Sequence, residues 1–291
     1  MTDSAKGVIR APASASTDGI AIRRVQSADE YDACVRMQHA IWGDDFTEIV
    51  PATMLCVTQH IGGVTAGAFD ASGQLLGFVF GMIGILDGRP VHWSDLLAVH
   101  PVARNKGLGR RLKLYQRELL LPLGVETMFW TYDPLVAKNA YLNIVKLGAR
   151  PVEYVVDMYG SETHSALHGA LGTDRFVVAW DLTHDGGAND RRASALEDGR
   201  EGAEAPVVNS LTRSEPSAPT TADLPDAPVV RVEVPTDIEE LIANDFASAM
   251  RLRESTRRIF AHYMDCGYRI TAFSHLLPED RSFYILSRND S

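Results

Sequence analysis

Residues 104–112 of the chain, RNKGLGRRL, combine two glycines with a cluster of basic side chains. They follow the apolar, strand-like run 91–99 and lead into residues 108–121, where apolar side chains recur at helical spacing. A tight turn from a strand into a helix leaves backbone N–H groups at the positive end of the helix dipole, and Gly107 and Gly109 let a phosphate approach them closely. Arginines that could add charge-assisted hydrogen bonds are Arg104, Arg110 and Arg111. The segment therefore predicts a phosphate-binding turn, with a basic surface turn as the alternative.

The residues around this turn disfavour other phosphate-binding motifs. No GK[ST] is present to supply a lysine and a magnesium-holding hydroxyl, as a P-loop nucleotide hydrolase requires. A third glycine and a ribose-binding acid at dinucleotide spacing are also missing. The remaining interpretation is a pyrophosphate that binds without an obligatory metal ion.

The turn belongs to a longer alternation of strands and helices. Apolar periodicity and turn residues predict strands at 20–25, 64–69, 74–84, 91–99, 125–132, 152–159, 175–182, 229–234, 268–275 and 282–288. They predict helices at 27–43, 51–62, 108–121, 137–149 and from Thr236 onward. Ser27 with Glu30, and Thr236 with Glu239, have the spacing of capping boxes at two of these helix starts.

Composition limits the class of protein. The chain has 291 residues, of which 45% are hydrophobic, so it can fill the core of one large domain or two modest ones. Its net charge of -10 argues against a protein that coats nucleic acid or anionic membrane, since both need broad positive surface. The three cysteines lack CxxC spacing, which favours buried thiols and predicts no metal site. Without a secretory h-region or a membrane span, we expect a cytoplasmic protein.

Composition also divides the chain into four stretches. Residues 1–19 are small and polar and predict a disordered tail. Residues 20–183 hold most strands and helices and are expected to form the main domain. Residues 184–228 are dominated by Ser, Thr, Pro, Gly, Asp and Ala, which predicts a low-complexity linker or insertion. Residues 229–291 predict strand, helix and strand; they are too few for a large core, so we expect them to pack on the main domain.

The order of motifs resembles a known superfamily. Strand LLAVHP, then R-x-x-G-x-G, a helix, a strand and a later helix with Asn-Ala and Lys-Leu-Gly resemble the GCN5-related N-acetyltransferases (GNAT), which are acyl-CoA-dependent transferases. The likeness covers residues 20–182. WTYDP, NAYLN and KLGA also resemble a less studied bacterial group, some of whose members are similar to amino-acid N-acyltransferases. The resemblance implies an α/β (α+β) fold with a mixed, mostly antiparallel central sheet flanked by helices, and here a C-terminal strand-helix-strand addition.

The resemblance also implies where an acyl-CoA co-substrate binds. The pyrophosphate of coenzyme A would lie on the amides of residues 105–110, and the pantetheine would pair with the backbone of strand 91–99. The residues implied in cofactor binding are Leu97, Val99, Arg104, Asn105, Lys106, Gly107, Leu108, Gly109, Arg110 and Asn139.

Two carboxylates are candidates for the acid–base chemistry of acyl transfer to an amine. Asp95 shares a strand face with Leu97 and Val99 by the period of two, so it is a candidate base or amine anchor. Its alternative is a carboxylate satisfied by backbone amides. Asp133 ends strand 125–132 and is a second candidate, with an Asx turn before Pro134 as its alternative.

The proton for the departing thiolate needs a donor. In the superfamily this is usually a tyrosine four residues before the glycine that closes the later helix, and Ile144 occupies that position here. Tyr141, one helical turn earlier, is the candidate catalytic acid. The alternatives are that Tyr141 is a packed aromatic and that solvent protonates the thiolate.

These observations predict an acyl-CoA-dependent N-acyltransferase that moves an acetyl or succinyl group to the amine of a small molecule, with an amino acid as one acceptor class. Direct attack in a ternary complex is expected, because no cysteine lies in the motif segments. If the acyl group carries a carboxylate, an arginine of the C-terminal segment RLRESTRRIF could bind it. A non-catalytic CoA-sensing or interaction module and a protein acetyltransferase are the alternatives, and a homodimer is an open possibility.

Overall fold

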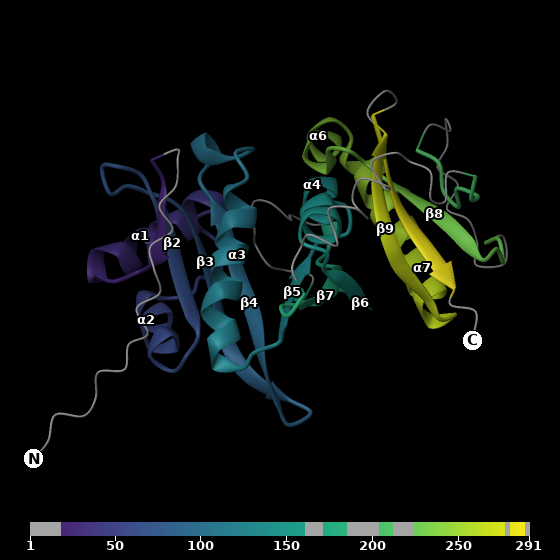
Figure 1. Ribbon diagram of the computed structural model, residues 1–291. Helices are drawn as coiled ribbons and strands as arrows, with labels where there is room; N and C mark the ends of the chain where they lie inside the picture. Colours follow the sequence, from purple (N-terminus) through teal and green to yellow (C-terminus); the bar gives the residue numbers. More distant parts are fainter. Residues whose placement is uncertain (1–18, 161–170, 185–203, 212–223, 277–279, 289–291) are drawn as a thin grey trace, which may run out of the picture. The chain divides into compact units, whose positions relative to one another are not determined.

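The computed structural model describes residues 19–160, 171–184, 204–211, 224–276 and 280–288 (Figure 1). The predicted tail before Gly19 and most of the predicted linker 184–228 lie outside these residues. Contacts divide the chain into two units, Met1–Ile41 with Val50–Val125 and Trp42–Ile49 with Glu126–Ser291. Each unit is described by itself.

The first unit is an antiparallel sheet with helices. Its strands are β1 (Ala21–Arg24), β2 (Val64–Phe69), β3 (Leu75–Leu86) and β4 (Arg89–Val99), and each pairs antiparallel with the next. Its helices are α1 (Ala28–Trp42), α2 (Ala52–His60) and α3 (Leu108–Leu120), with 3-10 turns at Pro101–Ala103 and Leu121–Leu123. Helix α3 lies along β2, β3 and β4 and buries Leu112 and Leu119 among other apolar side chains. The helices and strands predicted for this part are confirmed.

The start of α1 contains the capping box predicted from Ser27 and Glu30. The Ser27 hydroxyl accepts the Glu30 N–H at 3.3 Å, as the capping box predicts. The Glu30 carboxylate also interacts with the backbone N–H of Ser27, which completes the capping box. It accepts the Gln26 N–H at 2.8 Å and pairs with Arg23 of β1, with an Nη2–Oε1 distance of 2.7 Å. The cap therefore also joins the helix to the strand before it.

Gln38 closes the connection between α1 and α2. Its side chain is buried, its Nε2 donates to the Val50 carbonyl at 3.0 Å, and its Oε1 accepts the Val50 N–H at 2.8 Å. Gln38 thereby satisfies both backbone polar groups of a residue 12 positions later, as a neighbouring strand would.

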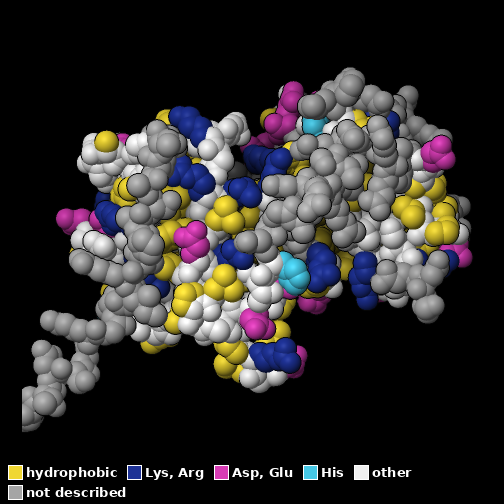
Figure 2. Space-filling model, viewed as in Figure 1, with side chains coloured by type: hydrophobic (Ala, Val, Ile, Leu, Met, Phe, Trp, Pro, Cys, Tyr) yellow, Lys and Arg dark blue, Asp and Glu magenta, His cyan; other side chains and the backbone are white. Residues whose placement is uncertain are grey.

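Strands β3 and β4 form a hairpin that continues past β2, since β2 begins opposite Gly81. Ile85 and Leu86 near its turn are 71% and 51% exposed. Figure 2 shows hydrophobic side chains at this tip beside acidic and basic ones.

The second unit contains two antiparallel three-strand arrays. One consists of β5 (Thr127–Tyr132), β7 (Arg175–Asp181) and β6 (Arg150–Val155), with α4 (Ala137–Ala140) and a π-helix (Tyr141–Lys146) after β5. The other consists of β8 (Val229–Val234), β10 (Arg281–Arg288) and β9 (Tyr268–Leu276), with α6 (Ile238–Asn244) and α7 (Phe246–Asp265) after β8. Strands β1 to β7 make up the mixed, mostly antiparallel sheet that was predicted, and the C-terminal strands form a sheet of their own.

Aromatic rings join the two arrays of this unit. The Phe176 ring of β7 lies 4.9 Å from Phe260 of α7 and 5.5 Å from Tyr284 of β10, measured between centroids. Tyr154 of β6 lies 5.7 Å from Phe260, and Phe273 of β9 lies 4.9 Å from Tyr284. Most of these contacts are edge-to-face, an arrangement that adds about 0.5–1.5 kcal/mol per pair to the area buried.

One local prediction in this unit is wrong, and another is confirmed with a different type of helix. The N-cap of α6 is Asp237, whose carboxylate accepts the Glu240 N–H at 3.1 Å, while the Thr236 hydroxyl donates to the Asp280 carbonyl. Aspartate accepts more strongly than threonine at an N-cap and stands directly before the helix. The helix predicted at 137–149 is α-helical for one turn and then widens into the π-helix.

In the part of the chain that the structure describes, we find no helix of the length and hydrophobicity that a bilayer crossing needs.

Candidate active site

The basic turn after β4 has the geometry of an anion site. His100 Nδ1 accepts the Val102 N–H, and the chain then passes through Asn105 and Gly107 in left-handed conformation, with φ of 61° and 71°. Gly107 is the N-cap residue of α3 and provides no side-chain cap. The first helical hydrogen bond runs from the Arg111 N–H to the Gly107 carbonyl. The amides of the first turn therefore point out of the helix start, where an anion is favoured.

Some side chains of this turn are exposed to solvent, and others make contacts within the protein. Arg104 and Lys106 are exposed, and Arg104 Nε donates to the Val99 carbonyl at 3.3 Å. Arg111 Nη2 donates to the Ile20 carbonyl at 3.1 Å, so this arginine holds the start of β1. The Leu108 side chain is 2% exposed, so it packs in the core and can offer a phosphate only its backbone amide. The structure thus brings the residues predicted at 104–110 together in one turn.

Asp95 lies at a β-bulge of β4. Leu96 pairs with Phe80 and Trp93 pairs with Met82, so two residues of β4, Ser94 and Asp95, oppose Gly81 alone. Bulges re-aim side chains and occur next to active sites. The Asp95 side chain is exposed. Desolvation by nearby protein raises its pKa, and a hydrogen bond from the Trp93 side chain lowers it by less.

Burial still alternates through the bulge, since Ser94 is buried whereas Asp95 and Leu97 are not. Leu97 pairs with Val79, and Val99 pairs with Gly77, in the regular section that leads to the basic turn. This section is the backbone to which the pantetheine prediction applies.

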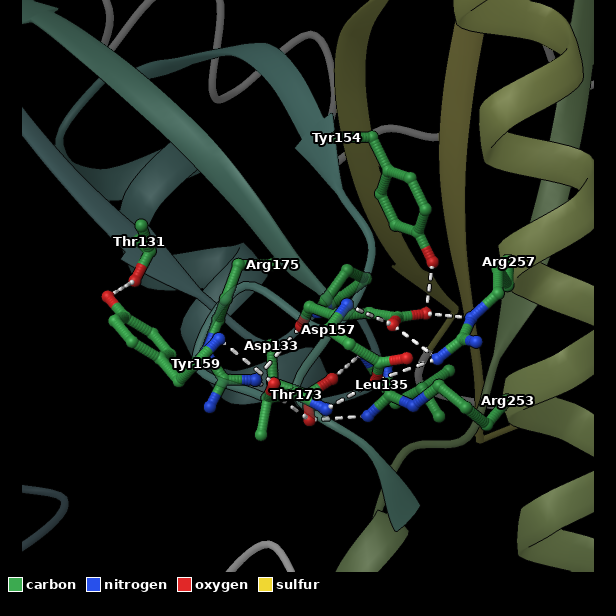
Figure 3. A network of polar contacts seen from close by, with 12 residues as sticks. Thr131, Asp133, Leu135, Tyr154, Asp157, Tyr159, Thr173, Arg175, Arg253 and Arg257 are labelled. Atoms are coloured by element: carbon green, nitrogen blue, oxygen red, sulfur yellow. Dashed lines mark hydrogen bonds and ion pairs between the residues drawn. The ribbon is translucent and has the colours of Figure 1, made fainter. Parts of the chain in front are cut away.

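Asp133, at the end of β5, is engaged from three sides (Figure 3). Its Oδ2 lies 2.5 Å from Arg253 Nη2 and 3.8 Å from Arg175 Nη1, and its Oδ1 accepts the Leu135 N–H at 2.9 Å. The last contact is the Asx turn named above as the alternative. Burial raises the pKa of Asp133, but the charge and hydrogen bond of Arg253, together with Arg175, lower it overall. Such a carboxylate is a weak base.

A second ion cluster uses the next arginine of α7 (Figure 3). Arg257 Nη2 lies 2.7 Å from Asp174 Oδ1 and 2.9 Å from Asp157 Oδ1, and Tyr154 donates to Asp174 Oδ2 at 2.6 Å. Burial raises the pKa of Asp174, but the hydrogen bonds from Arg257 and Tyr154 lower it overall. Both inward-facing arginines of RLRESTRRIF are therefore paired with carboxylates of this chain, and neither contact favours the carboxylate-reading role considered for that segment.

The helical residues proposed for the thiolate proton lie in the π-helix. Tyr141 is half-buried, and Lys146 Nζ lies 5.0 Å from the centroid of its ring. Each residue of a π-helix turns through a smaller angle than in an α-helix, so Tyr141 and Ile144 lie further apart around the axis than predicted. Asn143 is buried and accepts the Trp130 indole N–H at 3.1 Å, which ties the π-helix to β5. Asn139 is half-buried in α4.

The sequence analysis did not identify the arginines that pair with Asp133 and Asp174. Arg253 lies 120 residues after Asp133, and Arg257 lies 83 residues after Asp174. A signal was available in the spacing of four between these arginines, which puts both on one face of α7. Their carboxylates could not be chosen from the 38 acidic residues of the chain. Among the described residues, no group of three or more His, Cys, Asp or Glu is arranged to hold a metal ion.

Comparisons with known proteins were made for the whole chain. No protein-family model and no curated protein matches it. Similar solved structures include the ribosomal-protein-S18-alanine N-acetyltransferase from Escherichia coli, at 17% identity over 58% of this chain and 97% of that chain, with a TM-score of 0.44. The NatC complex bound to Gag peptide and CoA is similar at 13% identity, over 56% and 98% of the two chains, with a TM-score of 0.44.

A third similar structure is a protein of the GNAT family from Desulfovibrio desulfuricans, at 16% identity over 56% of this chain and 99% of that chain, with a TM-score of 0.44. This is the superfamily that the sequence resembles.

Proposed function

We propose that the chain is an acyl-CoA-dependent N-acyltransferase that moves an acetyl or succinyl group from coenzyme A to the amine of a small molecule. The observation that carries this proposal is the start of α3, where Gly107 is left-handed, no side chain caps the helix and the first-turn amides follow directly. A pyrophosphate needs such a row of N–H donors with no Cβ in the way. The exposed Arg104 and Lys106 add positive charge beside it.

The remaining roles follow from the chemistry of the transfer. The amine nitrogen attacks the thioester carbonyl, a C–N bond forms, the C–S bond breaks, and the amine gives up a proton. Asp95 is the better candidate to take that proton, because its pKa is raised and its side chain is exposed, whereas ion pairs lower the pKa of Asp133. Tyr141 or water returns a proton to the thiolate. An amino acid is the acceptor class that we propose to test first.

The first experiment is isothermal titration with CoA, acetyl-CoA and succinyl-CoA. Gly109→Val places a branched side chain over the first-turn amides without requiring a left-handed backbone, so we expect it to abolish binding in a folded protein. Gly107→Ala should weaken binding by straining the turn, at a cost of about 1–2 kcal/mol. Gly88→Ala is the matched control, because Gly88 has φ of 75° and open space around it, as Gly107 does, but lies in the β3–β4 hairpin.

Retained binding by Gly109→Val would contradict a phosphate site on these amides. A native protein that binds none of the three compounds would refute the acyltransferase proposal as a whole. A preference among the thioesters would identify the acyl group.

The alternative, a CoA-binding module without catalysis, is favoured by one observation. Ile144 stands at the usual position of the general acid, and the π-helix turns Tyr141 away from it. Asp95→Asn and Tyr141→Phe separate the two functions. An enzyme should keep CoA binding and lose most of its turnover of amino-acid amines, while a binding module has no turnover to lose.

A further inference from the structure

A buried chain of polar side chains joins α3 to the bulge of β4. Lys113 Nζ donates to Ser94 Oγ at 2.7 Å, Ser94 Oγ donates to Gln116 Oε1 at 2.8 Å, and Gln116 Nε2 donates to His92 Nε2 at 2.9 Å. All four side chains are at most 3% exposed. Lys113 and Gln116 belong to α3, while His92 and Ser94 belong to β4. None of the four has a part in the proposed acyl transfer.

The direction of each hydrogen bond follows from the groups involved. Burial, followed by the charge of Lys113, lowers the pKa of His92 to about 3, so its imidazole is neutral. Because its Nε2 accepts from Gln116, the proton of His92 must be on Nδ1. Burial also lowers the pKa of Lys113 well below its usual value. Gln116 is the central member, since its amide offers an acceptor to Ser94 and a donor to His92 at once.

These contacts fix the bulge from the helix side. Ser94 is one of the two residues that oppose Gly81, and the other is Asp95. A Cβ on Gly81 would lie 2.3 Å from His92 Nε2 and 2.4 Å from the Trp93 carbonyl, so the β4 backbone lies directly on this glycine. Ser94 is buried toward α3 while Asp95 beside it is exposed, so the two side chains leave the strand on opposite sides. The direction of the exposed Asp95 side chain therefore depends on the anchor of Ser94.

We propose that Gln116 is a positioning residue, which holds the β4 bulge through Ser94 and His92 and so directs Asp95 toward the amine. The role rests on the proposed function, because it needs Asp95 to act as base or anchor. Gln116 touches neither the basic turn nor the acyl group, so its effect should appear in the chemical step and leave the binding of CoA unchanged.

The test uses the full chain and two independent measurements. Gln116→Met keeps the volume of the side chain but removes both hydrogen bonds. Glu118→Met is the control, because it makes a change of the same kind on the exposed face of the same helix. Hydrogen exchange of the amides at 94–96, measured without substrate, should speed up in Gln116→Met and stay unchanged in Glu118→Met. Gln116→Met should lower kcat by about ten- to a hundredfold and leave KM for the acyl-CoA within about twofold. A small misplacement of a reacting group can have an effect of this size on the rate.

A pH profile then distinguishes positioning from general loosening. The apparent pKa of the acidic limb of kcat should shift in Gln116→Met and in Ser94→Ala, and should return toward the native value in Ser94→Thr, which keeps the hydroxyl.

The outcomes separate this proposal from the one it rests on. Unchanged exchange at 94–96 overturns the positioning role whatever the activity. Faster exchange with unchanged kcat and pH profile overturns it as well, because the network would then be only structural. If the native protein neither binds CoA nor turns over amines, the proposed function fails, and the positioning role fails with it for that separate reason.

Discussion

The carboxylate of Asp133 illustrates how the role of one residue depends on its partners. By position it is a candidate base, since it follows directly after a central strand. In the folded chain it lies between Arg253 and Arg175 and is 6% exposed. A buried carboxylate held by two guanidinium groups stabilises the native state above all, because removing it leaves charge without compensation. The same geometry makes it a poor proton acceptor.

Asp133→Asn is expected to destabilise the protein by about 3–5 kcal/mol, the usual effect of breaking a buried ion pair. In the double variant Asp133→Asn with Arg253→Met, part of this loss should be recovered, because one of the two arginines left without the carboxylate is then removed as well. The measurement is urea unfolding of the native protein, both single variants and the double variant. If Asp133→Asn is as stable as the native protein and loses only turnover, Asp133 is catalytic after all.

Lys113 leads to a prediction about pH. Its pKa is lowered in the folded chain, so the unfolded chain binds more protons in the window between that value and about 10.4, and stability must rise with pH there. Lys113→Met removes this dependence. Between about pH 7 and pH 9 the unfolding free energy of the native protein should therefore rise, relative to the variant, by up to about 1.4 kcal/mol per pH unit.

Urea unfolding at both pH values gives the two slopes. The exposed Lys138 offers the control, since Lys138→Met should follow the native protein. Equal slopes for the native protein and Lys113→Met would show that Lys113 is charged in the folded state.

At the scale of elements, periodicity was enough to predict nearly every strand and helix. Turn residues such as those of DASG, and apolar spacing such as that of 108–121, depend only on neighbours in sequence. Three features could not be predicted in this way: the bulge at Asp95, the π-helix at Tyr141–Lys146 and the second C-terminal helix. The first two coincide with contacts between separate elements, Ser94 with α3 and Asn143 with Trp130, which local periodicity does not encode. The third, α7, begins after its N-cap Asp245, which lies within the single helix predicted from Thr236 onward.

Gly81 gives the bulge a direct test. Gly81→Ala should destabilise the protein by about 1–3 kcal/mol, because its Cβ would collide with the backbone of β4. Gly84→Ala, in the same strand and with open space around the Cβ, should be neutral or slightly stabilising. Thermal unfolding of the two variants measures this difference in stability. A Gly81→Ala protein as stable as Gly84→Ala would mean that the close approach of the two strands is not required.

At the scale of the whole molecule, the segments on either side of the predicted boundary at residue 183 pack against each other. The strands before it share their core with the segment after it, through Phe176 with Phe260 and Tyr284. Residues 204–211, within the predicted linker, also have a fixed place. Val207 forms a parallel bridge with Arg231, and Asn209 bonds both backbone groups of Glu233. Composition could not reveal this, because low complexity describes a segment and not its partners.

A chain that ends at residue 184 is therefore expected to fold poorly. It would expose the ring of Phe176, which is worth about 1.5–3 kcal/mol when fully buried, and would leave Asp133 and Asp174 without Arg253 and Arg257. Gel filtration and near-UV circular dichroism of this fragment, beside the full chain, provide the measurement. A monodisperse fragment with a native-like near-UV spectrum would support residues 20–183 as a domain of its own.

The two hydrogen bonds between Gln38 and Val50 make the connection between α1 and α2 tolerant of changes in length. Because the buried Gln38 amide holds Val50, a longer loop between the end of α1 and Val50 costs only about 0.6 kcal/mol in closure entropy for each doubling of its length. This connection can therefore be lengthened or shortened while its two ends stay joined, provided that Gln38 is kept.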